Sequence, residues 1–328
     1  MRCKTLADEL RRRGADVRFV CRAQPGHLIP LLENAGYRVE VLPSSANIEQ
    51  SVDAEDTIAA LNGFPVDWLI ADHYDLDQEW ESRLRSRVDR IFVIDDLANR
   101  RHACDVLLDQ NWLEDDTRQR CQNAPQAECL MGPKYALLDP AFARVRTTLL
   151  AREGAIRRLL VFFGAVDAGN QTVKVMEALG APDMTDLTVD VVVGHANAAV
   201  AAIDRLANAR ANTTLYRPLP SLADLMAKAD LMLGAGGSTT TWERCCLGLP
   251  AIVAVYADNQ KSFTEALAKC GGHYSLGDAS AVTAAEWRNA LRELRSSPER
   301  TLAYSAKARR FTDGHGTERV AAVLMPAA

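Results

Sequence analysis

Residues 233–243, Leu-Gly-Ala-Gly-Gly-Ser-Thr-Thr-Thr-Trp-Glu, have the composition of a strand that leads into a glycine-rich turn and then into a helix. Glycines let backbone amides approach an anion, and a helix start adds N–H donors and a partial positive charge. Gly237, Ser238 and Thr239 could therefore hold a diphosphate without a metal, while Glu243 could accept both hydroxyls of a ribose. The same pattern also fits a tight strand-to-helix turn with Ser/Thr caps. Because G-x-x-x-x-G-K-[ST] is missing, a nucleoside triphosphatase of that type is disfavoured.

Two other polar segments follow predicted strands in the second half of the chain. One is the turn at residues 163–172, in which Asn170 either contacts a ligand or caps the next helix. The other contains Asn259 and Gln260, just after the strand at 251–255. Ligands of open α/β sheets bind outside the carboxyl ends of the strands. We therefore expect the three segments to lie at one edge of a sheet.

In the first half, polar residues follow two apolar strands, at Asp72-His73-Tyr74 and at Asp95-Asp96. A His-Tyr pair in a loop is more often structural than catalytic, but its place at a strand exit raises the odds of catalysis. The other histidines have no companions at ligand spacing, so we expect no metal. The eight cysteines include no C-x-x-C pair and are interpreted as reduced thiols.

Short β-branched runs alternate with amphipathic helical stretches, which predicts α/β structure with parallel sheets. The predicted strands are residues 16–21, 38–42, 66–71, 90–94, 104–108 and 128–131 in the first half, and 158–163, 187–193, 213–216, 230–233 and 251–255 in the second. We expect two doubly wound domains, at 1–150 and 156–328, with a linker near 149–156. The segment 298–325 is predicted to be mostly helical, and its last helix could pack back on the first domain.

Composition restricts the class of protein. The chain has 328 residues, of which 48% are hydrophobic and 25% charged, with a net charge of -5. These values are typical of a folded globular protein and disfavour a nucleic-acid partner. No apolar run approaches the roughly 20 residues that span a bilayer, and no signal segment follows Met1. We expect a cytoplasmic monomer that needs no cofactor and has no membrane partner.

The first predicted element is a helix, at residues 4–12, whereas a doubly wound domain normally begins with a strand. On the pattern alone, either the chain begins late or the helix leads.

With these segments assembled, the chain resembles the UDP-2,4-diacetamido-2,4,6-trideoxy-β-L-altropyranose hydrolases of pseudaminic acid biosynthesis, which are related to MurG-type glycosyltransferases. The resemblance covers nearly the whole chain and is specific only in combination. It rests on the glycine-rich turns and on residues 2–7, 72–74, 94–100, 104–111 and 132–138.

This resemblance implies two facing Rossmann-like domains in the glycosyltransferase-B arrangement, with UDP held by the C-terminal domain and the sugar reaching toward the N-terminal one. It implies cleavage of the UDP-sugar at the anomeric carbon with inversion, in a pathway that supplies flagellin glycosylation. The implied roles are ribose binding by Glu243, diphosphate binding by Gly237, Ser238 and Thr239, and a place beside the attacking water for Tyr74. Other substrate contacts are implied for Asn170, Asn259, Gln260 and Arg2.

The chain departs from the family at its front. Family members begin with a strand and a G-x-G-H-x-x-R-C turn whose His is the general base, and Met1-Arg2-Cys3 matches only the end of that motif. The departure favours a start assigned inside the reading frame, and it predicts UDP binding with little hydrolysis and a fragile N-terminal domain. Ala165 also replaces a usual glycine, which could crowd its turn. The alternatives are a UDP-sugar glycosyltransferase of the same fold and a UDP-binding module without activity.

Overall fold

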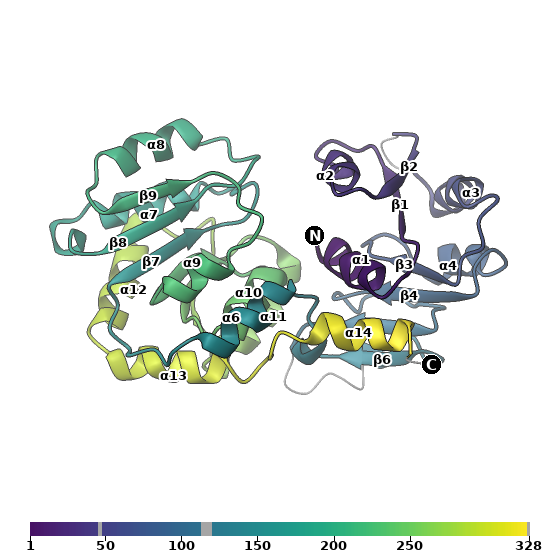
Figure 1. The fold of residues 1–328 in the computed structure, drawn as a ribbon. Helices are drawn as coiled ribbons and strands as arrows, with labels where there is room; N and C mark the ends of the chain where they lie inside the picture. The colour runs from purple at the N-terminus through teal and green to yellow at the C-terminus, as the bar shows by residue number, and fades with distance from the viewer. Residues whose placement is uncertain (45–47, 113–119, 327–328) are drawn as a thin grey trace. The chain divides into compact units, whose positions relative to one another are not determined.

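The computed structural model describes residues 1–44, 48–112 and 120–326, which form two compact units. The N-terminal unit consists of Met1–Leu137 together with Gly316–Ala328, and the C-terminal unit consists of Leu138–His315. Both units alternate helices and parallel strands, as the sequence predicts (Figure 1).

In the N-terminal unit the strands form two parallel sheets rather than one. The first sheet pairs β1 with β2, and the second has the order β3-β4-β5-β6. Within the described residues, β1 and β3 each therefore have a single paired edge. The elements of this unit are α1 (Arg2–Arg12), β1 (Arg18–Arg22), α2 (Ile29–Asn34), β2 (Arg38–Leu42), α3 (Gln50–Ala60), β3 (Trp68–Ala71), α4 (Gln78–Leu84), β4 (Arg90–Ile94), β5 (Val106–Asp109), β6 (Glu128–Met131), the 3-10 turn η1 (Pro133–Tyr135) and α14 (Gly316–Leu324).

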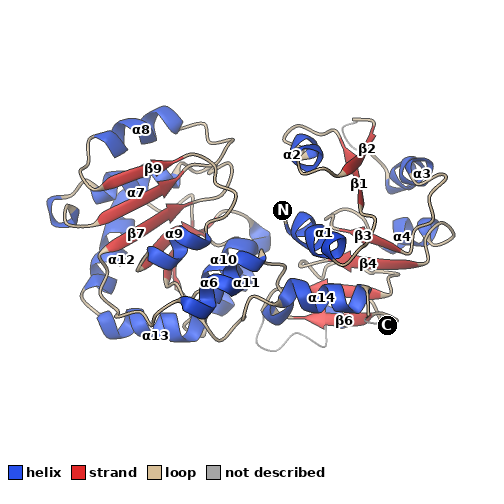
Figure 2. Cartoon of the chain, in the orientation of Figure 1, coloured by secondary structure: helices blue, strands red, loops and turns tan. Residues whose placement is uncertain are grey.

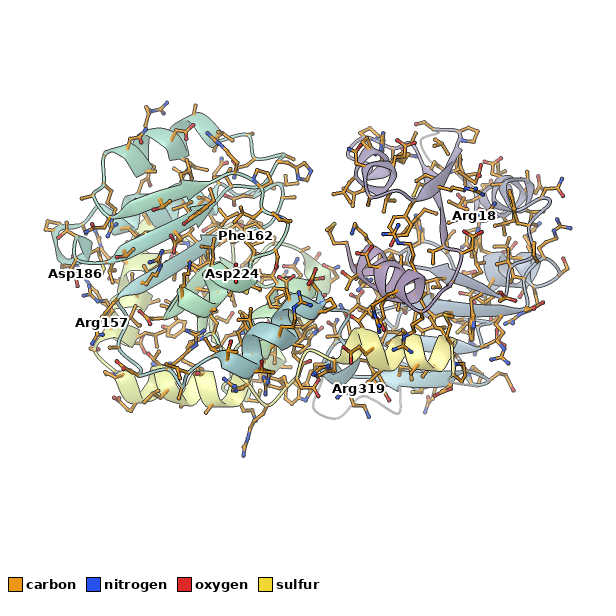
Figure 3. All side chains as sticks on the ribbon, viewed as in Figure 1. Arg18, Arg157, Phe162, Asp186, Asp224 and Arg319 are labelled. Carbon is orange, nitrogen blue, oxygen red and sulfur yellow. The ribbon has the colours of Figure 1, made fainter. Side chains whose placement is uncertain are left out.

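Helices α1 and α14 share the core of the four-stranded sheet. Leu6 and Leu10 of α1 and Val320 of α14 are buried with Phe92 and Leu108 of the sheet. Ala7, on the same helix α1, packs in a second cluster with residues of α2, β1 and β2. One amphipathic helix thus contributes to the core of both sheets. Arg319 fixes α14 further by donating to the Lys134 carbonyl oxygen at 2.9 Å (Figure 3).

The C-terminal unit has one six-stranded parallel sheet with the order β12-β11-β10-β7-β8-β9. Figure 2 draws its strands in red among the blue helices. Apart from Arg158 at the start of β7, its central strands β7, β10 and β11 are apolar and mostly buried, as expected for a sheet covered on both faces. The elements are α6 (Pro140–Thr148), β7 (Arg158–Phe162), α7 (Gln171–Leu179), η2 (Pro182–Met184), β8 (Thr188–Val192), α8 (Val200–Asn208), β9 (Thr213–Tyr216), α9 (Ala223–Lys228), β10 (Leu231–Ala235), α10 (Ser238–Cys246), β11 (Ala251–Val255), α11 (Asp258–Lys269), β12 (Tyr274–Asp278), α12 (Ala284–Arg295) and α13 (Pro298–Ala308).

The boundary between the units falls at Leu137, earlier than the predicted residue 150. The physical reason is α6, whose Arg146 donates to the carbonyl oxygens of Cys246, Thr312 and Arg309. These bonds attach α6 to the C-terminal unit. A short charged stretch is typical of a linker, but here Arg152 is itself anchored, because it donates to the carbonyls at the ends of α9 and α10.

Candidate functional site

The glycine-rich turn of the C-terminal unit joins β10 to α10. Gly237 is the N-cap of α10 and, as a glycine, has no side chain to cap the helix. The first hydrogen bond inside the helix runs from Thr241 N to Gly237 O at 3.0 Å. The amides of Ser238, Thr239 and Thr240 thus precede the first helical hydrogen bond. Such amides, together with the helix dipole, favour an anion.

The two glycines before α10 have different surroundings. A Cβ at Gly236 would lie 2.6 Å from Thr264 Oγ1, so the close packing of α11 requires glycine there. A Cβ at Gly237 would meet only the side-chain Nε2 of Gln260, at 3.9 Å. Gly237 therefore keeps space open at the start of α10, with the Gln260 amide at its border.

Glu243 lies on the second turn of α10 and is partly buried. Burial, and then the charge of Asp139, raise the pKa of its carboxyl to about 8. A carboxylate that accepts ribose hydroxyls must be ionised. In the ligand-free protein Glu243 is thus largely protonated at neutral pH, and a donor ligand would favour its ionisation.

The turn after β7 is held by Asp167. Its carboxylate accepts the amides of Gln171 and Thr172, both at 2.9 Å, and the hydroxyl of Tyr256 at 2.7 Å. Asn170 occupies the N-cap position of α7 in the left-handed region, yet its exposed side chain makes no cap bond. Asn170 was one candidate for the cap of this helix, but the side chain that caps α7 is that of Asp167.

The alanine at position 165 does not crowd this turn. Ala165 is exposed and does not have a positive φ, whereas Gly164 before it has φ 83°. The tight contact involves the backbone of Ala165, because a Cβ at Gly194 would come within 2.3 Å of the Ala165 carbonyl oxygen. The expected crowding is therefore wrong, since the restriction falls on Gly194.

Asn259 and Gln260 belong to the first turn of α11, after β11. Gln260 Oε1 accepts the amide of Tyr256 at 3.3 Å, and Asn259 is exposed. Because β7, β10 and β11 are parallel neighbours, their carboxyl ends meet at one edge of the sheet. The structure thus brings Asn170, Gly237 and Gln260 to the same edge, as expected.

A group of buried and partly buried side chains behind the turns supports this edge of the sheet. Sequence patterns did not predict these contacts. Trp287 Nε1 donates to Gln171 Oε1 at 2.7 Å, and the ring of Phe163 packs edge-on against Trp287 and Tyr256. All of these contacts join residues distant in sequence. They fix the turns after β7 and β11 relative to each other within the C-terminal unit.

In the N-terminal unit, Arg2 bridges two carboxylates that follow neighbouring strands. Its Nε and Nη2 donate to the oxygens of Asp72 at 2.9 and 2.6 Å, and its Nη1 donates to Asp96 Oδ2 at 2.9 Å. Only 10% of the Arg2 side chain is exposed. The guanidinium is therefore compensated inside this unit, which makes Arg2 a support for the two carboxylates rather than a free cation for UDP.

Tyr74 lies beside this bridge and is 48% exposed. Burial of part of its ring, followed by the charge of Asp96, raises the pKa of its hydroxyl, while Arg2 acts in the opposite direction. Arg100 holds the loop in place by donating to the carbonyl oxygens of His73 and Leu76 at 2.7 and 2.8 Å. Tyr74 thus has a fixed backbone and a solvent-facing side chain.

The motif around Asp95 is structural. Asp95 accepts the amides of Leu97 and Ala98, both at 3.1 Å. His102 is buried between Glu81 Oε1 at 2.6 Å and Asp95 Oδ2 at 3.3 Å. Burial alone would lower the pKa of His102, but the hydrogen bonds to both carboxylates outweigh burial and raise it to about 9. These bonds hold the loop that carries Asp96.

Two findings concern the described residues as a whole. In the ranges 1–44, 48–112 and 120–326, no group of three or more His, Cys, Asp or Glu side chains is arranged to hold a metal ion. In the same ranges, no helix has both the length and the apolar character needed to cross a membrane.

Residues 158–319 match the family model described as the Glycosyltransferase family 28 C-terminal domain. The chain is 27% identical over 215 residues to the Spore coat polysaccharide biosynthesis protein SpsG of Bacillus subtilis (strain 168). That match covers 65% of this chain and 63% of the relative, so the chain spans less than two thirds of the relative's length.

Solved structures share the fold over nearly the full chain. MurG of Acinetobacter baumannii superposes with a TM-score of 0.69 at 14% identity, covering 99% of this chain and 95% of MurG. The UDP-GlcNAc 2-epimerase of Neisseria meningitidis, solved with UDP-GlcNAc, gives 0.63 at 13% identity, covering 99% and 96%. The chain thus has the two Rossmann-like α/β domains with parallel sheets of the glycosyltransferase-B fold, and its residues 158–319 match the C-terminal domain of glycosyltransferase family 28.

Proposed function

We propose that this protein hydrolyses a UDP-sugar at the anomeric carbon with inversion, releasing UDP and the free sugar. The proposed substrate is UDP-2,4-diacetamido-2,4,6-trideoxy-β-L-altropyranose, which would place the reaction in pseudaminic acid biosynthesis. The observation that carries the proposal is the open start of α10, where Gly237 leaves space before the amides of Ser238 and Thr239.

In the proposed reaction the C-terminal unit binds the nucleotide. The amides of Ser238 and Thr239 take the diphosphate, Glu243 takes the ribose, and Asn170, Asn259 and Gln260 contact other polar parts of the substrate. UDP leaves as a stabilised anion, so amides and a helix dipole can absorb the charge that develops on it. Neither a metal nor a cofactor is needed for this step.

The N-terminal unit supplies the groups for attack by water. Tyr74 is solvent-facing and lies beside the Asp72–Arg2–Asp96 bridge. We place it beside the attacking water.

A UDP-sugar glycosyltransferase is the second candidate, favoured by the family 28 match of residues 158–319. The hydrolase and the transferase are distinguished by incubating the protein with the UDP-sugar in the absence of any acceptor and following UDP by ³¹P NMR. UDP release that continues beyond one equivalent of protein supports hydrolysis. Binding of UDP without release contradicts it and leaves a transferase or a binding module.

A further inference from the structure

Among the residues that the structure describes, one carboxylate oxygen of Asp96 has a hydrogen-bond partner and the other has none. Its Oδ2 accepts from Arg2, but within the described residues its buried Oδ1 has no hydrogen-bond partner. Only 7% of the side chain is exposed. A buried carboxylate oxygen without a donor is costly, so the position is suited to receive a proton or a donor group.

Charged groups of both signs surround Asp96. From α1 come Arg2 and the neutral thiol of Cys3, which donates to Asp72 at 3.1 Å. Arg120 contacts Asp109 and donates to the Asp96 carbonyl oxygen at 2.8 Å. Among the described residues, the carboxylates of Asp72, Asp96 and Asp109 thus face two guanidinium groups, and the α-amino group of the chain also acts on Asp72.

The cluster already favours proton uptake. Burial raises the pKa of Asp109 to about 6 despite the opposing charge of Arg120, and the charge of Asp96 contributes to the rise. A second buried acceptor lies next to it, since Asn111 Oδ1 also has no partner among the described residues while Asn111 Nδ2 donates to the Asp96 carbonyl oxygen at 3.4 Å. Two buried acceptor atoms of this region, Asp96 Oδ1 and Asn111 Oδ1, thus have no donor among the described residues.

Tyr74 connects this cluster to solvent. It is 48% exposed, whereas Asp96 Oδ1 is covered, and it lies close enough to Asp96 for that charge to act on its hydroxyl. A water molecule can therefore reach Tyr74 but not Asp96. The charge of Asp96 acts on the Tyr74 hydroxyl, so the half-exposed tyrosine lies next to the covered carboxylate.

We propose that Asp96 is the proton acceptor for hydrolysis and that Tyr74, as the catalytic residue, passes the proton to it; this rests on the proposed function. The water oxygen bonds to the anomeric carbon as the bond from that carbon to the diphosphate oxygen breaks. The electron pair of the broken bond leaves with UDP. The water proton moves to the Tyr74 oxygen, while the Tyr74 proton moves to Asp96 Oδ1. Asp96 then returns its proton to solvent by the same route. Arg2 and Asp72 are positioning residues.

The test compares Asp96→Asn and Tyr74→Phe with Asp56→Asn. The control is matched because Arg22 bridges Asp53 and Asp56 at 2.7 and 3.0 Å, much as Arg2 bridges Asp72 and Asp96. General-base groups contribute roughly 10²- to 10⁴-fold to rate. We expect Asp96→Asn to lower kcat for UDP release by about 100-fold or more, with the affinity for UDP unchanged.

Tyr74→Phe should give a similar loss without unfolding, because the side chain is half exposed, and the double variant should be no slower than either single variant. Asp56→Asn should keep its kcat. The inference is overturned if Asp96→Asn keeps the wild-type kcat or loses no more than Asp56→Asn. If Asp96→Asn fails to fold, a wild-type kcat and pH profile for Tyr74→Phe overturns it instead. If the wild type releases no UDP, the proposed function itself is overturned. That outcome differs from one in which the wild type and the Asp96 and Tyr74 variants are all active, which overturns only this inference.

Discussion

Asp167 accepts the hydroxyl of Tyr256 at 2.7 Å, joining the turn after β7 to the end of β11. The same carboxylate caps α7 through the amides of Gln171 and Thr172. Tyr256→Phe should lower the free energy of unfolding by about 1 kcal/mol, since it removes one hydrogen bond. Asp167→Ala should cost more, about 2 to 4 kcal/mol, because it also removes the cap.

Urea unfolding measures both changes. Tyr274→Phe is the control, because the Tyr274 hydroxyl donates to the exposed Glu293 at 2.9 Å and its loss should have almost no effect. Equal effects of Tyr256→Phe and Tyr274→Phe would contradict the role given to Asp167.

Two adjacent glycines should respond differently to alanine. Gly236→Ala places a Cβ 2.6 Å from Thr264 Oγ1 and should destabilise the C-terminal unit by about 1 to 3 kcal/mol. Gly237→Ala enters open space, with φ -65° and ψ 143°, and should leave stability unchanged. It should nevertheless weaken UDP binding about tenfold by covering the start of α10. Thermal melts and UDP titration calorimetry separate the two effects; unchanged UDP affinity in Gly237→Ala would refute the anion site.

Glu243 should couple nucleotide binding to proton release. Its pKa of about 8 means that it is mostly protonated at pH 7, and ribose hydroxyls favour the ionised form. UDP affinity should therefore rise from pH 6.5 to pH 8.5. Calorimetry in two buffers of different ionisation enthalpy should detect the released proton. In Glu243→Gln the affinity should be lower and the extra proton release should disappear, whereas the exposed Glu265→Gln should match the wild type.

The same carboxyl should affect stability with a defined sign. The folded pKa is raised above the ordinary value of 4.5, so the protonated form is favoured on folding and the cost of ionisation grows as pH rises from about 4.5 to about 8. Glu243→Gln removes this cost. Its unfolding free energy at pH 8 should exceed that of the wild type by about 1 kcal/mol after allowance for solvent screening. A lower value would contradict the burial of this group.

His102 should stabilise the N-terminal unit at low and neutral pH. Its pKa is raised from 6.5 to about 9, so its contribution is fully present below about pH 6.5 and is lost as pH rises through about 9. His102→Gln should reduce stability by about 3 kcal/mol at pH 6 because it leaves two buried carboxylates. The difference from wild type should shrink by pH 9.5. The exposed His195→Gln is the control, and a pH-independent difference would contradict an ionised His102.

Local patterns predicted the strands well. The ranges 38–42, 90–94, 128–131, 213–216 and 251–255 agree with the observed strands, because apolar β-branched runs are buried in parallel sheets. The pattern missed β12, where Ser275, Gly277 and Asp278 interrupt the apolar run. The split of the N-terminal strands into two sheets was also not predicted, since pairing partners are not encoded in local periodicity.

The site was predicted only in part. The glycine-rich turn was visible because its residues are adjacent in sequence. The bridge from Arg2 to Asp72 and Asp96 joins residues 70 and 94 positions apart, and no local pattern marks such a contact. The same holds for Asp167 and Tyr256, which are 89 positions apart.

The central claim is attack by water at the anomeric carbon of a UDP-sugar. The most direct measurement incubates the protein with UDP-2,4-diacetamido-2,4,6-trideoxy-β-L-altropyranose in ¹⁸O-labelled water and follows the products by NMR and mass spectrometry. We predict that the label enters the free sugar, that the first anomer formed is inverted, and that UDP carries no label. Label in the phosphate of the nucleotide, or no UDP release at all, would contradict the claim.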